Sequence, residues 1–333
     1  MILPTRRPKR LCVVAACFNE EAVIERFYQR LKTVLTSLDG VDHRIHVVDD
    51  GSTDGTLDRL HEIADRDERV FVYSLSRNFG HQIALSAGLD TAVGDAVVFL
   101  DSDLQHPPDL IPRMVELWNQ GYDVVSAVRS STAGSGVFKR LSSRLFYALI
   151  NRLSDTPIVP NAADFGLLSQ RAWNALQQMP ERHRFLRGMI PWIGFRRTFV
   201  SFEAPPRVAG RSKYTLGRML GLALNGIFSF SSVPLRMASR LGTALVLAGA
   251  GYFVYVLARY FLAGGLVAGW GSLICTMLIL GGTQLVFTGL IGEYLARVYE
   301  ETKQRPLYFF KEEPCRETGD RWKDHALTEH VTS

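Results

Sequence analysis

Cysteine is scarce in this sequence. Four of the 333 residues are cysteines, and no two of them form a Cys-x-x-Cys pair: Cys12, Cys17, Cys275 and Cys315. Disulfide-rich secreted domains and zinc fingers need more cysteines at closer spacing. We therefore expect reduced, incidental thiols, as in a cytosolic catalytic domain.

Other common signals are also missing. The first ten residues are basic and lack the apolar core of a secretory signal peptide, so we expect nothing to export the N-terminal part. There is no Gly-x-Gly-x-x-Gly dinucleotide loop, no phosphate-binding loop ending in Gly-Lys-Ser/Thr, and no internal repeat or low-complexity tract. The net charge of +5 is small, and we expect no nucleic-acid partner.

What is present is an alternation of short apolar runs and helical patterns. Runs that predict buried strands lie at 11–16, 45–48, 70–75, 96–100 and 123–127. Helices are predicted at about 22–38, from 56 to 64, from 82 to 92 and from 109 to 120, the first capped by Asn19. The alternation predicts an α/β fold with a mainly parallel sheet covered by helices on both faces.

Polar residues follow these strands where ligands bind in open α/β sheets. Asn19, Asp50, Asp101 and Asp103 each come within three residues of the end of an apolar run. The carboxyl ends of parallel strands meet at one edge, so we expect these side chains to line a single cleft.

The segment Asp101-Ser102-Asp103-Leu104-Gln105-His106-Pro107-Pro108 carries the strongest chemical signal. Asp101, Asp103 and the Gln105 carbonyl oxygen offer the hard oxygen ligands that Mg²⁺ or Mn²⁺ prefers, usually shared with substrate phosphates. Taken alone, so short a motif is more often an acidic turn that caps the next helix.

A second polar segment, 49–56, suggests a nucleotide site. A carboxylate at a strand tip can accept hydrogen bonds from a ribose or base, and Gly51 and Gly55 permit close approach of a ligand. A turn that caps the following helix explains the segment about equally well.

Four ordered motifs carry a resemblance to a known family. They are Cys17-Phe18-Asn19-Glu20, then Val48-Asp49-Asp50-Gly51-Ser52-Thr53-Asp54, then Arg77-Asn78-Phe79-Gly80, then the segment from Asp101 to Pro108. The chain resembles family 2 glycosyltransferases of GT-A fold, and among them the polyprenyl-phosphate glycosyltransferases, which include dolichyl-phosphate mannose synthase and the bactoprenol glucosyltransferases. The likeness covers residues 11–215 and the apolar tail; Ser102 stands where alanine is common.

The resemblance implies roles for particular residues. A nucleotide-sugar would be bound by residues at the first four strand ends: Phe18, Asn19, Glu20, Asp50, Ser52, Arg77, Asn78 and Asp101. The metal would be held by Asp101, Asp103 and Gln105. The catalytic set would be Asp103, Asp164, Arg207 and Lys213.

The acceptor phosphate would be held by basic and hydroxyl residues further along the chain: Arg129, Lys139, Arg140, Ser143, Arg207, Ser212 and Lys213. A solvated helix face at 139–144 and a juxtamembrane basic patch at 207–213 are the simpler alternatives. A phosphate nucleophile is already anionic at neutral pH, so we expect Asp164 to act in positioning or as a modest base.

The C-terminal third predicts a membrane anchor. Residues 215–236 read as amphipathic interfacial helix, and Leu241–Leu262 and Ser272–Leu295 are apolar enough to predict two spans. Basic residues on both sides of this pair put both of its ends in the cytoplasm: Arg236, Arg240, Arg297, Lys303 and Arg305. The predicted organisation is a GT-A domain at 1–214, juxtamembrane helices at 215–238, two transmembrane helices at 239–296 and a tail at 297–333.

These features together predict an inverting glycosyltransferase at the cytoplasmic face of the inner membrane. The donor would be a nucleotide-sugar, with UDP-glucose ranked first and GDP-mannose and UDP-aminoarabinose as alternatives, and the acceptor a polyprenyl phosphate. A processive polysaccharide synthase would need more spans and a Gln-x-x-Arg-Trp motif, and neither is present. A non-catalytic membrane scaffold that binds nucleotide-sugar is a further alternative, and a homotetramer is possible by analogy.

Overall fold

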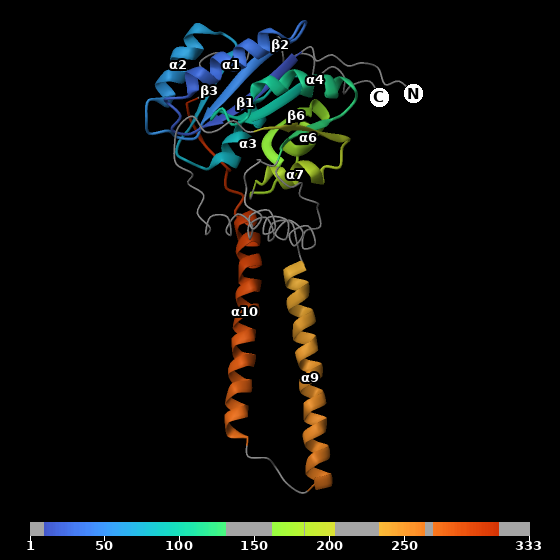
Figure 1. Cartoon of the computed structure of the whole chain (residues 1–333). Coiled ribbons are helices and arrows are strands. Elements are labelled where there is room, and N and C mark those ends of the chain that lie inside the picture. The colour runs from blue at the N-terminus through green and yellow to red at the C-terminus, as the bar shows by residue number, and fades with distance from the viewer. Residues whose placement is uncertain (1–9, 131–161, 183, 204–232, 264–268, 313–333) are drawn as a thin grey trace, which may run out of the picture. The chain divides into compact units, whose positions relative to one another are not determined.

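The computed structural model describes residues 10–130, 162–182, 184–203, 233–263 and 269–312. The chain forms two compact units (Figure 1). The first contains the described residues up to 203 together with 306–312, and the second contains the two long helices between them. Each unit is described by itself.

The first unit is an α/β structure. Its strands are β1 Arg10–Cys17, β2 Asp42–Asp49, β3 Val70–Leu75, β4 Ala96–Asp101, β5 Val124–Arg129, β6 Ala162–Ser169, β7 Arg197–Phe202 and β8 Phe310–Glu312. Its helices are α1 Ile24–Thr36, α2 Thr56–Arg66, α3 His81–Thr91, α4 Ile111–Asn119, α6 Gln170–Gln177 and α7 Leu186–Trp192, with a 3-10 turn at Pro108–Leu110.

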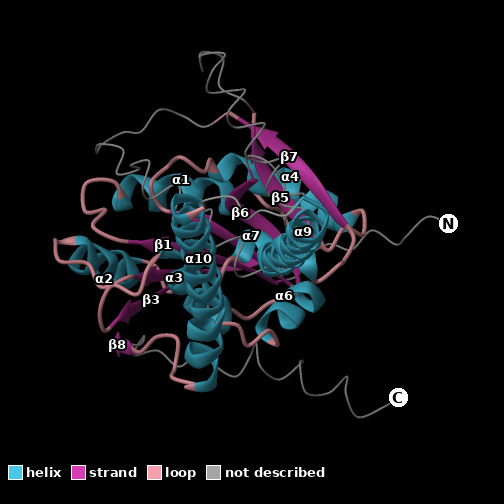
Figure 2. Ribbon diagram, turned by 90° about the horizontal axis from the view of Figure 1, so that it is seen from below, coloured by secondary structure: helices cyan, strands magenta, loops and turns pink. Residues whose placement is uncertain are grey.

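The strands form one sheet in the order β7-β5-β6-β4-β1-β2-β3-β8 (Figure 2). Strands β4, β1, β2 and β3 are mutually parallel, as predicted. Beyond β4 the sheet is mixed, because β6 runs antiparallel to both β4 and β5 while β5 and β7 are parallel. The parallel block brings the ends of β1, β2 and β4 together at one edge.

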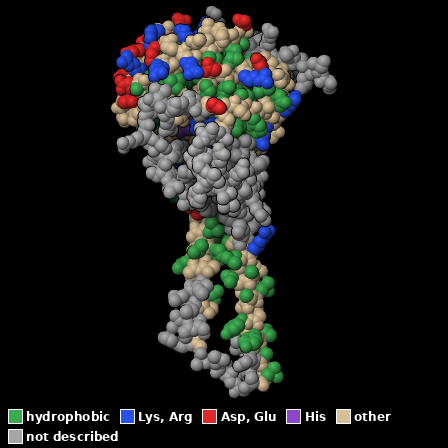
Figure 3. Space-filling model, in the orientation of Figure 1, with side chains coloured by type: hydrophobic (Ala, Val, Ile, Leu, Met, Phe, Trp, Pro, Cys, Tyr) green, Lys and Arg blue, Asp and Glu red, His purple; other side chains and the backbone are tan. Residues whose placement is uncertain are grey.

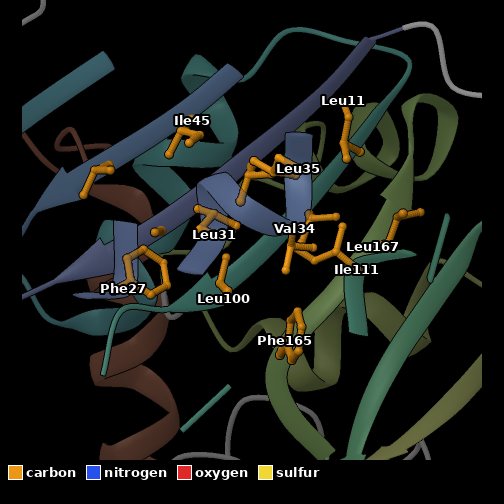
Figure 4. Packing of buried hydrophobic residues seen from close by; sticks show 14 of the residues in the cluster. Leu11, Phe27, Leu31, Val34, Leu35, Ile45, Leu100, Ile111, Phe165 and Leu167 are labelled. Atoms are coloured by element: carbon orange, nitrogen blue, oxygen red, sulfur yellow. The ribbon is translucent and has the colours of Figure 1, made fainter. Parts of the chain in front are cut away.

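One face of the sheet is covered by α1, α2 and α4. In Figure 4, Phe27, Leu31 and Leu35 of α1 point at the sheet, where Ile45 and Leu100 meet them. All five are at most 2% exposed. Burying an aliphatic or aromatic side chain of this size stabilises the fold by about 1.5–3 kcal/mol, so this layer holds the strand ends in place.

The opposite face is covered by α3, α6 and α7. Helix α3 packs so closely that a Cβ on Gly88 would lie 2.3 Å from Cγ1 of Val14 in β1. The first residue of α3, His81, is thereby held beside the end of β4.

The far edge of β3 is covered by residues from the end of the described chain. The Ser76 amide donates to the carbonyl oxygen of Phe309 (2.9 Å), and β8 pairs antiparallel with β3. The Tyr308 hydroxyl donates to Asp90 in α3 (3.0 Å). An edge strand left open invites pairing with other chains, and this short strand closes it. Nothing in the sequence predicted it, because three residues are too few for a periodic signal.

The second unit consists of α9 Val233–Ala263 and α10 Trp270–Thr302. Both segments predicted to be spans are therefore helical. Over the described residues, no helix meets the combined length and hydropathy needed to cross a membrane. Large apolar side chains are nevertheless exposed along both helices (Figure 3), among them Leu247 (68%), Leu262 (88%) and Leu285 (73%). Of the segment predicted to form interfacial helices, 215–238, residues 215–232 lie outside the described residues, and residues 233–238 form the first part of α9.

Candidate active site

The loop after β1 is tied to the loop after β2. Asn19 adopts a left-handed conformation (φ 55°), which asparagine tolerates better than most residues. Its side-chain oxygen accepts a hydrogen bond from the backbone amide of Thr53 (2.9 Å), and its backbone amide donates a hydrogen bond to Ser52 Oγ (2.9 Å). The predicted cap role of Asn19 is wrong, since α1 begins only at Ile24 and Val23 precedes it. Asn19 instead joins two loops that line the site.

Asp50 is buried (2% exposed) at the end of β2. Its carboxylate accepts hydrogen bonds from the amides of Phe79 (2.7 Å) and Gly80 (3.0 Å). Burial raises the pKa of Asp50, although the two amide hydrogen bonds oppose the rise. Asp50 therefore fixes the loop after β3, a role that was not predicted. Its assignment to nucleotide binding stays a prediction.

Gly51 makes a close approach to that same loop. Its φ is +70°, and a Cβ there would lie 2.6 Å from the carbonyl carbon of Arg77 and 2.8 Å from the Asn78 amide nitrogen. Both neighbours are backbone atoms, which cannot move aside cheaply. Gly40 has the same φ of +70° with nothing within 4 Å of the added Cβ, so it provides a matched control.

We expect Gly51→Ala to lower the free energy of unfolding by about 2–4 kcal/mol, through backbone strain plus overpacking. Gly40→Ala should cost only the strain of a left-handed alanine, about 1–2 kcal/mol. Urea unfolding of the two purified variants measures the difference. Equal losses would show that the loop after β3 yields to the added methyl group.

Arg77 and Asn78 are exposed on the loop that Asp50 and Gly51 hold. The guanidinium of Arg77 stacks over the Phe79 ring, with 4.2 Å between its central carbon and the ring centroid. Stacking of this kind leaves the donor edge of the guanidinium available to a ligand.

A cleft of about 240 Å³ opens where these loops meet the end of β4. Its walls come from the ends of β1, β2 and β4 and the start of α3: Ala16, Cys17, Phe18, Glu20, Asp50, Asn78, Gly80, His81, Ala84, Asp101, Ser102 and Asp103. Most of the residues predicted to bind the nucleotide-sugar line it, and Asn19 and Ser52 form the adjoining turn. The predicted convergence of strand ends is therefore present.

The aspartate segment makes a tight turn after β4. Leu104, buried at 8% exposure, takes a left-handed conformation (φ 61°), which is unusual for leucine. The turn lets Asp103 Oδ1 accept a hydrogen bond from the Gln105 amide (2.9 Å) while its side chain lines the cleft. The Gln105 carbonyl oxygen Oε1 lies 3.5 Å from Nη2 of Arg129, toward β5.

These residues fit a divalent ion that is shared with a ligand. The Oδ1 atom of Asp101 is buried and makes no hydrogen bond of normal geometry, although Nε2 of His81 lies 2.9 Å away. Within the described ranges, no three His, Cys, Asp or Glu side chains are grouped as a metal cage. Two carboxylates in an open cleft are the arrangement expected for Mg²⁺ or Mn²⁺ completed by substrate phosphates.

Asp164 lies in β6 on the face covered by α3 and α7. Its carboxylate accepts two hydrogen bonds from Arg187 of α7 (2.8 and 2.7 Å) and one from Nε2 of Gln82 (3.0 Å). The side chain of Asp164 is 6% exposed, whereas that of Arg187 is 35% exposed. His81 lies between this carboxylate (3.7 Å) and that of Asp101.

The surroundings set the charges of this cluster. Burial raises the pKa of Asp164, but the hydrogen bonds and charges of His81 and Arg187 outweigh it and hold that pKa well below its usual range. Burial lowers the pKa of His81, and the carboxylates of Asp101 and Asp164 reverse this and raise it to about 10. A carboxylate held so firmly in its charged form is a weak proton acceptor.

On the other side of Asp101 lies His106, which is 1% exposed. Its Nδ1 atom is 3.4 Å from Oδ2 of Asp101, and its Nε2 atom is 3.5 Å from Nη2 of Arg129. Arg129, predicted to contact acceptor phosphate, ends β5 and is half-buried beside the aspartate segment.

Several predicted site residues lie outside the described residues: Lys139, Arg140, Ser143, Arg207, Ser212 and Lys213. Their assigned roles stay predictions. Three residues of the site were missed from the sequence: His81, His106 and Arg187. His106 stands inside the motif at 101–108 and His81 directly after the motif at 77–80, so position could have indicated both. Arg187 has no sequence signal, because α7 reaches β6 only in the fold.

Comparison with known proteins agrees with this geometry. The glycosyl transferase family 2 model matches residues 12–176. An uncharacterized glycosyltransferase of Synechocystis sp. is 43% identical over 298 residues, which is 90% of this chain and 93% of that protein. The chain belongs to glycosyl transferase family 2. It is a glycosyltransferase of GT-A fold, as the four motifs predicted.

Other proteins are similar to the chain over most of its length. The bactoprenol glucosyl transferase of Shigella phage SfX is 37% identical over 302 residues, covering 91% of this chain and 99% of that protein. Among solved structures, a mannosyltransferase from Pyrobaculum calidifontis in complex with GDP-Man and Mn²⁺ matches with a TM-score of 0.47 at 17% identity, covering 91% of this chain and 89% of the other.

Proposed function

We propose that this glycosyltransferase moves a hexose, with glucose ranked first, from a nucleoside diphosphate sugar to a polyprenyl phosphate. The observation that carries the proposal is the full-length similarity to bactoprenol glucosyl transferases, which extends over 91% of this chain and so includes α9 and α10. A relative that shared only the cleft would support a sugar transferase without supporting a lipid acceptor.

In the proposed reaction, the donor lies in the cleft with its nucleoside near Asn19, Asp50 and Arg77. Asp103, together with Asp101, would hold Mg²⁺ or Mn²⁺ against the donor diphosphate. Such an ion neutralises the charge that develops on the departing nucleoside diphosphate. Gln105 lies at the Arg129 side of this position.

The chain's own residues then orient the two phosphates. Arg129 supplies a guanidinium at the edge of the aspartate segment, which suits a bidentate hold on the acceptor phosphate. The acceptor oxygen is anionic before it attacks the anomeric carbon, so the step needs little base assistance. Asp164, locked by Arg187, would keep His81 and through it Asp101 in place. Catalysis on this account is mainly alignment and charge stabilisation.

Membrane attachment through α9 and α10 is part of the proposal, with the first unit on the cytoplasmic side. Exposed residues such as Phe261 (77%), Val286 (69%) and Leu295 (64%) support it, since so much apolar surface needs a lipid or protein cover. Arg240 near the start of α9 and Lys303 after α10 support a cytoplasmic position for both helix ends. Carbonate extraction of membranes tests the attachment, and release of the protein into the supernatant would contradict it.

Sugar transfer by the purified full-length protein tests the reaction. Undecaprenyl phosphate, Mn²⁺ or Mg²⁺, and labelled UDP-glucose, UDP-galactose, GDP-mannose or UDP-aminoarabinose would be supplied, and label measured in the lipid phase. We expect label from UDP-glucose. Label in the lipid from another donor would support the proposed acceptor and show that the transferred sugar is not glucose. Nucleotide release without lipid label would overturn the acceptor, and metal-dependent nucleotide binding without turnover would favour a scaffold.

A further inference from the structure

His106 occupies an unusual place for a histidine. It is 1% exposed, lies within the aspartate segment, stacks on Phe165 (5.5 Å between ring centroids) and meets Phe202 edge-on (6.0 Å). Aromatic packing alone would be served equally well by phenylalanine, without the cost of burying two ring nitrogens. The nitrogens therefore need partners, and the structure provides one at each end of the ring.

At one end the partner is Asp101. Nδ1 of His106 lies 3.1 Å from the Asp101 amide nitrogen and 3.4 Å from Oδ2 of its carboxylate. Either neutral tautomer is held there, because Nδ1 accepts from the amide when bare and donates to the carboxylate when protonated.

At the other end the partner is Arg129, whose Nη2 lies 3.5 Å from Nε2. A guanidinium can only donate, so this contact is a hydrogen bond when Nε2 accepts and the ring proton sits on Nδ1 facing the Asp101 carboxylate. In that tautomer Nδ1 no longer accepts from the Asp101 amide and instead donates to the Asp101 carboxylate, so that the imidazole connects a carboxylate of the cleft to the guanidinium of Arg129. Asp101 is also contacted by His81 (2.9 Å), and Arg129 by Gln105 (3.5 Å), so His106 is the element common to both.

We propose that His106 is a positioning residue that fixes Asp101 through one ring nitrogen and Arg129 through the other, and so sets the distance between the donor diphosphate and the acceptor phosphate. The inference rests on the proposed function, which assigns the two partners to the two substrates. An error of about 1 Å in such an alignment can cost about a hundredfold in rate.

Two substitutions of His106 by amide side chains test the contact with Asp101 and the contact with Arg129 separately. Asparagine places its polar group near the position of Nδ1, and glutamine near that of Nε2. In His106→Asn we expect the KM for undecaprenyl phosphate to rise about tenfold and the KM for the sugar donor to stay within about twofold, a tenfold change being about 1.4 kcal/mol. In His106→Gln we expect the reverse. His106→Phe, which keeps the stacking on Phe165, should raise both constants and lower kcat.

Calorimetric binding of UDP or GDP with Mn²⁺ to the full-length protein gives a readout that needs no turnover. We expect His106→Gln to weaken nucleotide binding and His106→Asn to leave it within about twofold. Equal changes of both constants in the asparagine and glutamine variants would overturn the proposal, since a packing role cannot distinguish the two ends.

The same measurements separate this inference from the proposed function. If the wild-type protein binds nucleotide and Mn²⁺ but transfers no sugar to undecaprenyl phosphate, the acceptor assignment fails. Calorimetric nucleotide binding by the two variants still tests whether His106 positions Asp101. If one amide variant does not fold, the other decides alone: a change confined to one substrate supports the proposal, and a change in both overturns it.

Discussion

Asp103→Asn should reduce sugar transfer by about 10²–10³-fold. Asparagine has the same shape, and its side-chain oxygen can still accept the hydrogen bond from the Gln105 amide (2.9 Å), so the turn should persist. What is lost is a negative charge on the wall of the cleft. A bound divalent ion contributes several kcal/mol of charge stabilisation, and each 1.4 kcal/mol changes the rate about tenfold. Initial rates of label transfer over a Mn²⁺ titration measure the loss.

Asp109→Asn is the matched control for this variant. It makes the same chemical change six residues further on, in a side chain that is 56% exposed and pairs with Arg30 on the surface (2.7 Å). Exposed pairs contribute about 0–1 kcal/mol, so its transfer rate should stay within about twofold of wild type. If Asp103→Asn kept more than a tenth of the activity at saturating Mn²⁺, the assignment of a metal to Asp103 would be wrong.

The central sheet could be predicted because its signals are local. The run before Asp101 is continuously apolar and the one before Asp50 is interrupted only by His46, and the structure places β4 and β2 there. β3 agrees with its predicted bounds, Val70–Leu75. The mixed end of the sheet was not predicted, because the direction of β6 against β4 depends on pairing between residues about 70 positions apart, such as Val98 and Leu167.

The site was only partly predictable for a related reason. Asp101 and Asp103 follow a strand, and two carboxylates at that position indicate a function from the sequence alone. The roles of Asp50 and His106 depend on partners that only the fold supplies, an amide pair at Phe79–Gly80 and the guanidinium of Arg129. The sequence indicates where the strands end, while the contacts that hold each strand-end side chain come from tertiary packing.

Asp164 depends strongly on its partner Arg187. Replacing Arg187 should destabilise the first unit more than replacing an arginine of a surface ion pair. Asp164 is 6% exposed and accepts two hydrogen bonds from Arg187. Breaking a fully buried pair costs about 3–5 kcal/mol. Arg187 is 35% exposed, and water can partly replace it, so we expect Arg187→Met to cost about 2 kcal/mol and to lower the Tm by about 4–8 °C.

A double-mutant cycle shows whether this cost arises because the buried Asp164 carboxylate loses its charged partner or because packing is lost. Methionine retains most of the apolar stem of arginine, so the packing loss should be small. In an Asp164→Asn background the charge is already gone, and Arg187→Met should then cost no more than about 0.5 kcal/mol. Arg113→Met, which breaks an exposed pair with Glu116 on α4, should change stability by less than about 0.5 kcal/mol. Equal costs of Arg187→Met in the two backgrounds would mean that Arg187 supports the fold through contacts of its guanidinium other than those with the Asp164 carboxylate.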